Sequence, residues 1–419
     1  MKPESLMMTY GYKPSLSEGA LKCPIFQTST FVFNSAMEGK RFFELAYGIR
    51  EKDKGEELGL IYSRLNNPDL EILENRLCLW DEAEDCAVFE SGMSALSTAF
   101  LEFTTPGDLF VYSRPVYGGT DHFINHFLKK IQVEAVGFYA TDSKEQIIKR
   151  IEETGKANRL TMIHIETPAN PTNVLIDIEM CAEIKKHFST QEKPVILSVD
   201  NTYMGPIWQH PLKHGADLVV YSATKYIGGH SDVIAGACLG SKNLIGKVKS
   251  LRTFLGNMAG PWTGWLLMRS LETLKVRMEQ QDKNAQKVAI YLKNHPKIEK
   301  VYYLGFINDG NDQKEKNIYE KQCTSAGAMI SFDIKGGEKE AFQFLDALKL
   351  IKLAVSLGGT ESLAEHPQTM THADVSEKDK QLMNISEKLV RLSVGVEHYS
   401  DIIEDIEQAL SSVDTIITF

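Results

Sequence analysis

The feature that most constrains the fold is an alternation of short apolar runs with longer amphipathic stretches, over residues 68–240. Short runs rich in β-branched residues predict strands, and the amphipathic stretches between them predict helices. This alternation is typical of an α/β domain with a parallel sheet. Because ligands of open α/β sheets bind at the carboxyl ends of strands, the residues that follow the runs are candidates for chemistry. The predicted strands are 86–89, 108–112, 160–165, 195–199, 218–221 and 233–239.

The sequence on either side of this block has a different character. Residues 1–66 show no clear period and predict an irregular arm, and residues 67–260 predict the large domain. Asn67 is expected to cap a helix whose first turn holds Pro68. Residues 261–419 begin with a long amphipathic stretch and continue with α+β-like alternation, so they predict a smaller C-terminal domain.

Charge and cysteine usage exclude several classes of function. The chain has 46 Lys and Arg against 56 Asp and Glu, a net charge of −10, which argues against partners such as nucleic acid or an anionic membrane. It has no run of about 18 apolar residues and no signal-peptide core near its start, so we expect a cytoplasmic protein. Six cysteines without a CxxC pair predict reduced thiols. We assign no metal site.

The strongest chemical signal is Lys225, which follows the predicted strand 218–221 and precedes a Gly-Gly turn. A lysine amine in this place can form a Schiff base with a carbonyl cofactor. The hydroxyl groups of Ser222 and Thr224 beside it suit a phosphate oxygen. On spacing alone, a structural lysine remains an alternative.

Two other strand ends supply what such a cofactor requires. Asp200 follows the run 195–199, where a carboxylate can keep a pyridine nitrogen protonated, although a helix-capping role is the alternative. Gly92 lies between Ser91 and Met93 in a turn that leads from a strand into a helix. Free N–H groups at a helix N-terminus bind anions, but glycine at such turns is also common.

Three more positions are candidates for ligand contacts. Tyr117 precedes a Gly-Gly pair, and Asn170 lies in a proline-bounded turn; each also suits a purely structural turn. Arg391 places a cation inside a β-type run and needs a carboxylate partner, either structural or from a substrate. His366 and His372 flank Pro367-Gln-Thr-Met-Thr, and we interpret them as loop residues.

Together these motifs resemble the Cys/Met-metabolism family of pyridoxal-phosphate (PLP) enzymes over nearly the whole chain. The resemblance implies the PLP-dependent transferase fold type I, with a mostly parallel sheet in the large domain, a smaller α+β C-terminal domain and a homotetramer built from dimers. The motifs occur in the family's order and are Pro24-Ile-Phe-Gln-Thr-Ser-Thr-Phe31, Tyr62-Ser-Arg64, Ser91-Gly-Met93, Tyr117-Gly-Gly-Thr120, Glu166-Thr-Pro-Ala-Asn-Pro171, Asp200-Asn-Thr202, Ser222-Ala-Thr-Lys225, Ser356-Leu-Gly-Gly359 and Arg391-Leu-Ser-Val-Gly395.

The resemblance implies a role for each candidate in binding PLP. Lys225 would be the Schiff-base lysine and proton shuttle, and Asp200 would pair with the pyridine nitrogen. Tyr117 would stack on the ring and act in catalysis, and Asn170 would bond the phenolic oxygen. The remaining cofactor contacts would be Ser91, Gly92, Met93, Ser222 and Thr224, with Tyr62 and Arg64 reaching in from a neighbouring subunit.

The resemblance also implies an amino-acid substrate. Arg391 would bind its α-carboxylate, and Ser356 would steer the lysine. Val355 stands where methionine-handling members tend to carry valine and cystathionine-handling members glutamate, which predicts a γ-lyase acting first on methionine and second on cystathionine. The runner-up is a γ-synthase or sulfhydrylase that uses an O-acylhomoserine. Gly119 departs from the cysteine that bacterial methionine γ-lyases usually carry.

Two segments depart from the family pattern. Residues 41–59 form a longer segment than the family usually has, in an arm expected near a neighbouring subunit's site. Trp262 and Trp265 follow Pro261, and the resemblance gives them no role.

Overall fold

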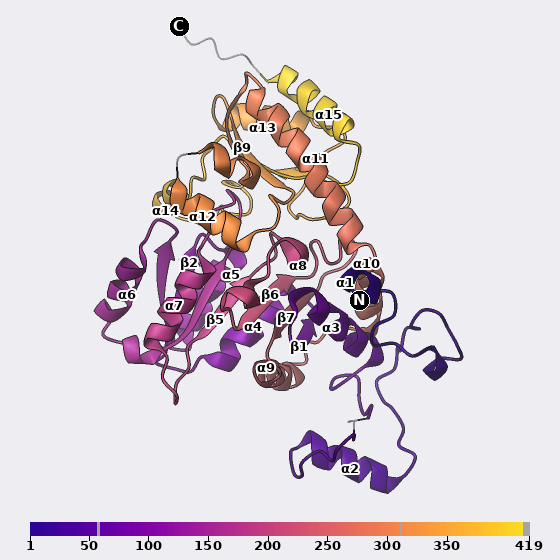
Figure 1. Cartoon of the computed structure of the whole chain (residues 1–419). Helices are drawn as coiled ribbons and strands as arrows, with labels where there is room; N and C mark the ends of the chain where they lie inside the picture. The colour runs from indigo at the N-terminus through magenta and orange to yellow at the C-terminus, as the bar shows by residue number, and fades with distance from the viewer. Residues whose placement is uncertain (57–58, 311, 414–419) are drawn as a thin grey trace.

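Two sheets organise the chain, one of seven strands and one of five (Figure 1). The structure is a computed structural model that describes residues 1–56, 59–310 and 312–413. The five-stranded sheet lies above the seven-stranded sheet in Figure 1, and the arm projects to the lower right.

The seven-stranded sheet has the order β1-β7-β6-β5-β4-β2-β3. The strands β6, β5, β4, β2 and β3 pair in parallel, whereas β7 is antiparallel to both of its neighbours. The predicted α/β fold with a mostly parallel sheet is therefore confirmed. The strands are β1 Asp85–Phe89, β2 Leu109–Arg114, β3 Glu134–Tyr139, β4 Leu160–Glu166, β5 Ile196–Asp200, β6 Leu218–Ser222 and β7 Gly236–Gly240.

Two strands of this sheet differ from the prediction. β3 was not predicted; it lies at the edge of the sheet, where only Phe138 is fully buried, so its sequence carries a weak apolar signal. The predicted strand 233–239 begins later, at Gly236, because residues 233–235 belong to the turn that follows Lys225.

Helices cover both faces of this sheet. Alternate residues of a strand point to opposite faces, so Phe110 packs in a cluster with residues of α4 and α9, whereas Val111 packs in a cluster with residues of α6 and α7. The helices are α3 Pro68–Asp81, α4 Gly92–Phe103, α5 Gly118–His122, the π-helix η2 Phe123–Leu128, α6 Lys144–Glu153, η3 Ala157–Arg159, α7 Ile178–Phe188, α8 Gly205–Trp208, η4 Pro211–His214 and α9 Lys242–Leu255.

The predicted start of α3 is confirmed. The side chain of Asn67 accepts a hydrogen bond of 3.0 Å from the N–H of Asp69, and Pro68 is the first helical residue. Leu70 and Leu73 are buried on the inner side of the helix.

The second sheet has the order β10-β11-β12-β9-β8 and is antiparallel except for the β10–β11 pair. The predicted long amphipathic stretch is helical, and it is divided into two helices by a break at Glu272 and Thr273. The elements are α10 Pro261–Leu271, α11 Leu274–Asn294, β8 Ile298–Tyr302, η5 Leu304–Asp309, α12 Gln313–Gln322, β9 Met329–Ile334, α13 Glu338–Ala347, β10 Lys352–Leu353, β11 Leu363–Glu365, α14 Glu377–Leu382, β12 Leu389–Ser393 and α15 Tyr399–Ser412.

One hydrophobic cluster joins the two sheets. It runs from Leu73 in α3, through Tyr226 after β6, to Phe332 in β9. Because a close-packed interior resists deformation, this cluster fixes the loops of one sheet relative to those of the other.

The arm is more regular than predicted. It holds α1 Pro3–Leu6, η1 Pro14–Leu16 and α2 Ala36–Ala46, and the Ser35 side chain caps α2 by accepting a hydrogen bond of 3.1 Å from the N–H of Glu38. α2 projects away from the rest of the molecule (Figure 1). Of the longer segment 41–59, residues 57 and 58 lie outside the described residues.

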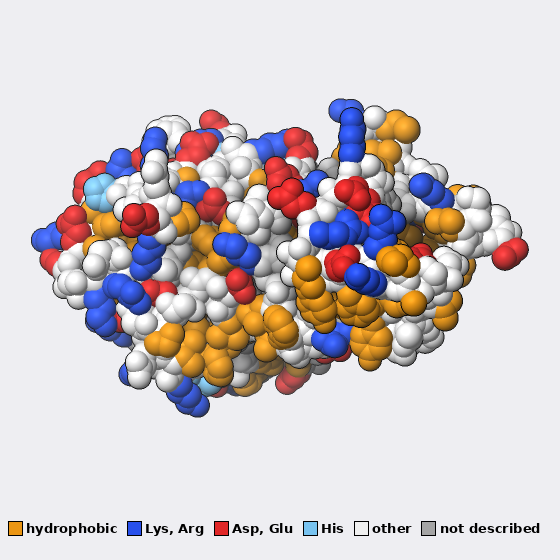
Figure 2. Space-filling view, turned by 90° about the horizontal axis from the view of Figure 1, so that it is seen from below, with side chains coloured by type: hydrophobic (Ala, Val, Ile, Leu, Met, Phe, Trp, Pro, Cys, Tyr) orange, Lys and Arg blue, Asp and Glu red, His pale blue; other side chains and the backbone are white. Residues whose placement is uncertain are grey.

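Hydrophobic side chains are exposed on the arm. Val32, Met37, Tyr47 and Ile49 are 62–94% exposed. Figure 2, which views the molecule from the side of α2, shows hydrophobic side chains gathered in patches on this face. Within the described residues, no helix is both long and apolar enough to cross a bilayer.

Candidate active site

A cavity of about 310 Å³ lies where the carboxyl ends of β4, β5 and β6 face residues 355–357 and β12. All predicted site residues except Tyr62 and Arg64 line it. These lining residues are Ser91, Gly92, Met93, Tyr117, Asn170, Asp200, Ser222, Thr224, Lys225, Val355, Ser356 and Arg391.

Lys225 lies in a tight turn directly after β6. Its backbone N–H donates to the carbonyl oxygen of Ser222 at 3.0 Å, and its Nζ donates to the Oγ of Ser356 at 2.9 Å. Burial, with a smaller effect of the nearby Arg391 charge, lowers the pKa of Lys225 to about 8. An amine with this pKa is partly neutral at physiological pH, which nucleophilic and proton-transfer roles both require.

Two buried carboxyl groups stand side by side at the strand ends. Glu166 ends β4 and pairs in register with Asp200, which ends β5. Burial and the neighbouring Asp200 raise the pKa of Glu166 to about 8, and burial also raises the pKa of Asp200. Such a pair favours a cation brought between or beside the two groups.

Glu166 also holds two turns of the site in place. Its Oε2 accepts a hydrogen bond of 2.6 Å from the N–H of Tyr117, and its Oε1 accepts one of 2.9 Å from the N–H of Asn170. Glu166 belongs to the motif Glu166-Thr-Pro-Ala-Asn-Pro171, but its place in the sequence predicted no role for it. The signal that could have identified it was a carboxylate at the end of a buried strand, in the position that corresponds to Asp200 on the next strand.

The start of α4 forms an anion cradle. Gly92 and Met93 are the first residues of α4, where backbone N–H groups have no partner within the helix. A Cβ atom at Gly92 would lie 2.9 Å from the Cβ of Ser222, so only glycine permits the close approach of α4 to the end of β6. Thr202 supports this approach, because its Oγ1 accepts a hydrogen bond of 2.9 Å from the N–H of Ser222.

Arg391 is buried and held from three sides. Its Nη1 lies 2.6 Å from Oε1 of Glu365 and donates to Oδ1 of Asn170 at 3.0 Å, and its Nη2 donates to the carbonyl oxygen of Ser356 at 2.8 Å. Tyr203 also donates to Oδ1 of Asn170, at 2.8 Å. These contacts fix the guanidinium at the edge of the cavity.

Glu365 was not among the predicted site residues. It lies in β11 directly opposite Arg391 in β12 and is fully buried. An acidic residue inside the apolar run Leu363-Ala-Glu365, in a strand next to a buried arginine, was the signal that could have identified it.

The opposite side of the cavity is apolar. Val355 and Ile234 line it with 58% and 69% of their surfaces exposed, and Leu357 lies beside them. Among the described lining residues, the carboxylates are Glu166 and Asp200, which lie at the strand ends. Between Val355 and Leu357, Ser356 has a φ of 145°, a conformation that favours glycine and is found at functional sites.

Tyr117 lies near the mouth of the cavity, beside Gly119. A Cβ atom at Gly119 would lie 2.7 Å from Cε1 of Tyr117 and 3.3 Å from Sδ of Met93. The absence of a side chain at position 119 therefore permits the observed position of the Tyr117 ring.

Tyr62 and Arg64 lie on the arm, outside the cavity of their own chain. Nη1 of Arg64 donates to the carbonyl oxygen of Thr253 at 3.0 Å, and its guanidinium lies 5.6 Å from the centre of the Tyr62 ring. Their predicted contact with a cofactor in a neighbouring subunit stays a prediction.

The cavity fits a flat phosphorylated pyridine aldehyde. The Lys225 amine suits the aldehyde, and the buried Asp200, with its raised pKa, suits a cationic ring nitrogen. The close approach at Gly92 leaves the N–H groups of α4 and the hydroxyl of Ser222 facing the place of a phosphate.

Comparisons with known proteins agree with this chemistry. Residues 4–411 match the model of the family described as Cys/Met metabolism PLP-dependent enzyme. An L-methionine gamma-lyase of Fusobacterium nucleatum subsp. nucleatum is 39% identical over 94% of each chain, and a cystathionine gamma-lyase of Bacillus subtilis is 37% identical over 99% of this chain and 100% of its own. The cystathionine gamma synthase structure from Xanthomonas oryzae pv. oryzae is similar with a TM-score of 0.86, 29% identity and 98% of each chain covered. A fold, a lysine-containing cavity and a relative above 30% identity thus lead to one conclusion: this chain belongs to the Cys/Met metabolism family of PLP-dependent enzymes, with pyridoxal phosphate as its cofactor.

Proposed function

We propose that this chain is a carbon–sulfur γ-lyase that converts L-methionine and water into methanethiol, 2-oxobutyrate and ammonia, with cystathionine as a second substrate. The observation that carries the proposal is the division of the cavity, with a fixed arginine at one side and an apolar wall at Val355 and Ile234. Methionine has a carboxylate for Arg391 and an uncharged thioether for this wall. Cystathionine carries a second ammonium and carboxylate, for which the wall offers no charged partner among the described lining residues.

The roles of the side chains follow from their geometry. Bound PLP supplies an electron sink that stabilises negative charge at the substrate's α-carbon. Arg391 holds the α-carboxylate, which orients the Cα–H bond toward Lys225. The Lys225 amine removes that proton, and the Ser356 hydroxyl, at 2.9 Å, orients the amine. Asp200 keeps a positive charge on the ring nitrogen, because a buried carboxylate is stabilised by a cation beside it.

Tyr117 is the proposed acid for the leaving group. Its backbone N–H donates to Oε2 of Glu166 at 2.6 Å, which fixes the backbone position from which the ring extends at the cavity mouth. The phenol can donate a proton to the thiolate as it departs, which prevents a poorly stabilised anion from forming in the cavity.

Product analysis tests the proposal. The PLP-loaded protein is incubated with L-methionine or L-cystathionine, and methanethiol, 2-oxobutyrate, cysteine and pyruvate are quantified. Methanethiol and 2-oxobutyrate in equal amounts from methionine support the proposal. Turnover of cystathionine with none of methionine would reject the methionine assignment. It would also show that Gly119 indicates the preferred substrate better than Val355 does.

Replacement chemistry is the second candidate. The likeness to a cystathionine γ-synthase structure, with a TM-score of 0.86, favours testing it. The assay combines an O-acylhomoserine with a thiol. Rapid thioether formation with negligible 2-oxobutyrate would identify a γ-synthase or sulfhydrylase instead of a lyase.

The proposed assembly is a homotetramer built from dimers, in which Tyr62 and Arg64 of one chain reach the cavity of the next. Support comes from the exposed apolar side chains of the arm and from the position of Tyr62 and Arg64 outside their own cavity. Sedimentation should give four times the 47.0 kDa chain mass, and a monomer with full activity would contradict the proposal.

The proposed location is the cytoplasm. All six cysteines are free thiols, and reduced thiols are typical of that compartment. Cell fractionation tests this directly, and recovery of the protein from an oxidising compartment would contradict it.

A further inference from the structure

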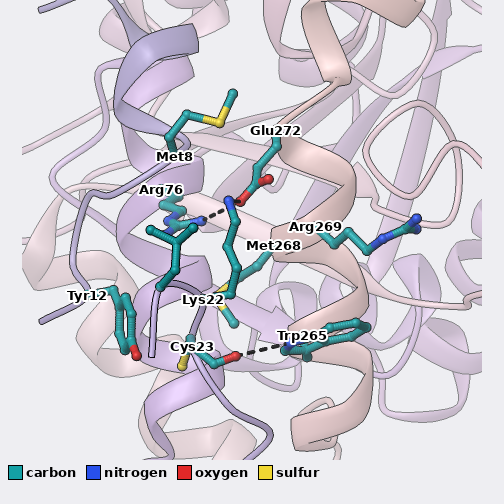
Figure 3. Close-up of a pocket in the computed structure, with 10 residues that line it drawn as sticks. Met8, Tyr12, Lys22, Cys23, Arg76, Trp265, Met268, Arg269 and Glu272 are labelled. Atoms are coloured by element: carbon teal, nitrogen blue, oxygen red, sulfur yellow. Dashed lines mark hydrogen bonds and ion pairs between the residues drawn. The ribbon is translucent and has the colours of Figure 1, made fainter. Parts of the chain in front are cut away.

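A second cavity, of about 250 Å³, lies between the arm, α3 and α10 (Figure 3). It shares no lining residue with the catalytic cavity. The arm contributes Tyr12 and Lys22, α3 contributes Arg76, and α10 contributes Trp265 and Met268.

Arg76 is the unusual member of this cavity, because its charge is almost completely buried. Its side chain lines the cavity although the residue is only 4% exposed. Nε donates to the carbonyl oxygen of Tyr10 at 3.0 Å, and Nη1 lies 3.9 Å from Oε1 of Glu272, too far for a hydrogen bond. Among the described residues, Nη2 has no hydrogen-bond partner. The donors that this guanidinium leaves unused open onto the cavity, where an anion can accept from them.

Around Arg76, positively charged side chains outnumber negatively charged ones. Lys22 and Arg269 also line the cavity, whereas Glu272 is its one carboxylate among the described residues. Glu272 is already held by Nζ of Lys22 at 2.6 Å. The cavity is therefore positive in a chain whose net charge is −10.

The remaining walls are apolar and fixed. Trp265 Nε1 donates to the carbonyl oxygen of Cys23 at 3.1 Å, which holds the indole against the arm, as Figure 3 shows. Met268 is buried beside it. On the other side, the Tyr12 hydroxyl donates to the carbonyl oxygen of Ala20 at 2.8 Å. A ligand that fits these walls has an apolar body.

We propose that this cavity binds a small organic monocarboxylate, with its carboxylate on Arg76 and Lys22 and its apolar body between Tyr12 and Trp265. Such a ligand ties the arm to α3 and α10, because all three contribute to its contacts. This assignment does not depend on the reaction that the catalytic cavity performs.

Isothermal titration calorimetry on the PLP-loaded protein tests the proposal with 3-phenylpropionate as the probe. The neutral 3-phenylpropanamide has the same shape without the charge, so it should bind far more weakly. Arg76→Met removes the guanidinium and keeps most of the apolar stem, and it should weaken the acid by about tenfold or more. Lys22→Met should weaken it by several-fold.

Arg269→Met is the matched control. Arg269 lines the same cavity and is exposed, but its guanidinium points away from Arg76 and Lys22 in Figure 3. Its removal should change the affinity by less than about twofold, since screened surface charges contribute little.

Three results would overturn the proposal. Equal binding of the amide would remove the role of the charge, and no binding of either probe would show that the cavity is closed in the assembled protein. Binding that survives Lys22→Met and Arg76→Met but is lost in Arg391→Ala would place the acid in the catalytic cavity. If Arg76→Met does not fold, because Arg76 also holds Tyr10, the exposed Lys22→Met variant decides between these results.

Discussion

The two sides of the catalytic cavity differ in how their side chains are held. On the polar side, Glu166 accepts two backbone hydrogen bonds, Lys225 donates to Ser356, and Arg391 contacts Glu365, Asn170 and Ser356. On the apolar side, the side chains of Val355 and Ile234 are more than half exposed and have no polar group that could form a hydrogen bond.

This difference separates two parts of the function. The polar side is a network of buried charges, and loss of one member leaves another buried charge without its partner. The apolar side carries no such constraint, so it can change with little effect on the fold. We therefore infer that the polar side fixes the reaction class and the apolar side selects the substrate.

Lys225→Ala should have the largest effect on the polar side. We expect kcat to fall by more than about 10⁴-fold, because the same amine bonds the cofactor and moves the proton. Steady-state assays with methionine measure this. Lys225→Arg serves as a control that keeps a positive charge. A fall in kcat much smaller than about 10⁴-fold in either variant would show that another residue performs these steps.

Arg391→Ala should have the next largest effect. Loss of a buried charge-assisted contact with the carboxylate should cost about 2–5 kcal/mol in kcat/KM. The variant also leaves the fully buried Glu365 unpaired, so its unfolding temperature should fall.

A double variant separates these two effects. Arg391→Ala combined with Glu365→Gln removes both charges, and it should recover much of the stability without recovering kcat/KM. If the double variant recovers activity as well, Arg391 supports the fold and does not bind the substrate.

Val355→Glu should have a smaller effect, confined to the apolar side. A carboxylate at position 355 favours the distal ammonium of cystathionine and disfavours a thioether, so the ratio of kcat/KM for cystathionine to that for methionine should rise by about tenfold. The half-exposed position limits the gain because solvent screens the charge. Val355→Gln controls for size, and an unchanged ratio in Val355→Glu would reject Val355 as the selector.

The smallest effect concerns stability in the cofactor-free protein. Burial lowers the pKa of Lys225 from 10.5 to about 8, so the folded state binds fewer protons than the unfolded state between these values and this group favours folding more as pH rises. Lys225→Met should therefore raise the urea midpoint at pH 7, with a smaller gain at pH 10. A gain of the same size at both values would contradict the lowered pKa.

The polar side was largely predictable from sequence because its residues follow strands. Asp200 comes directly after an apolar run, Gly92 and Lys225 lie in the turns that follow two others, and a parallel sheet brings such positions to one edge. Glu365 was not predictable in this way. Its role depends on a cross-strand pairing with Arg391, which sequence spacing does not reveal.

Two elements, α2 in the arm and the edge strand β3, could not be predicted from the apolar pattern of the sequence. Helix α2 was not predicted, because residues 1–66 show no clear apolar period. The edge strand β3 was missed for a related reason, since a half-exposed strand needs few apolar residues. β3 is stabilised by its pairing with β2, whereas α2 is stabilised by local contacts such as the Ser35 cap.

The most direct test of the account is to locate the cofactor. Borohydride reduction of the PLP-loaded protein fixes the bond between the cofactor aldehyde and its lysine, and proteolysis with mass spectrometry then identifies the labelled peptide. We predict that the label falls on Lys225 and is absent from the Lys225→Ala variant. A label on a different lysine, or none in protein that turns over methionine, would contradict the assignment of this cavity as the active site.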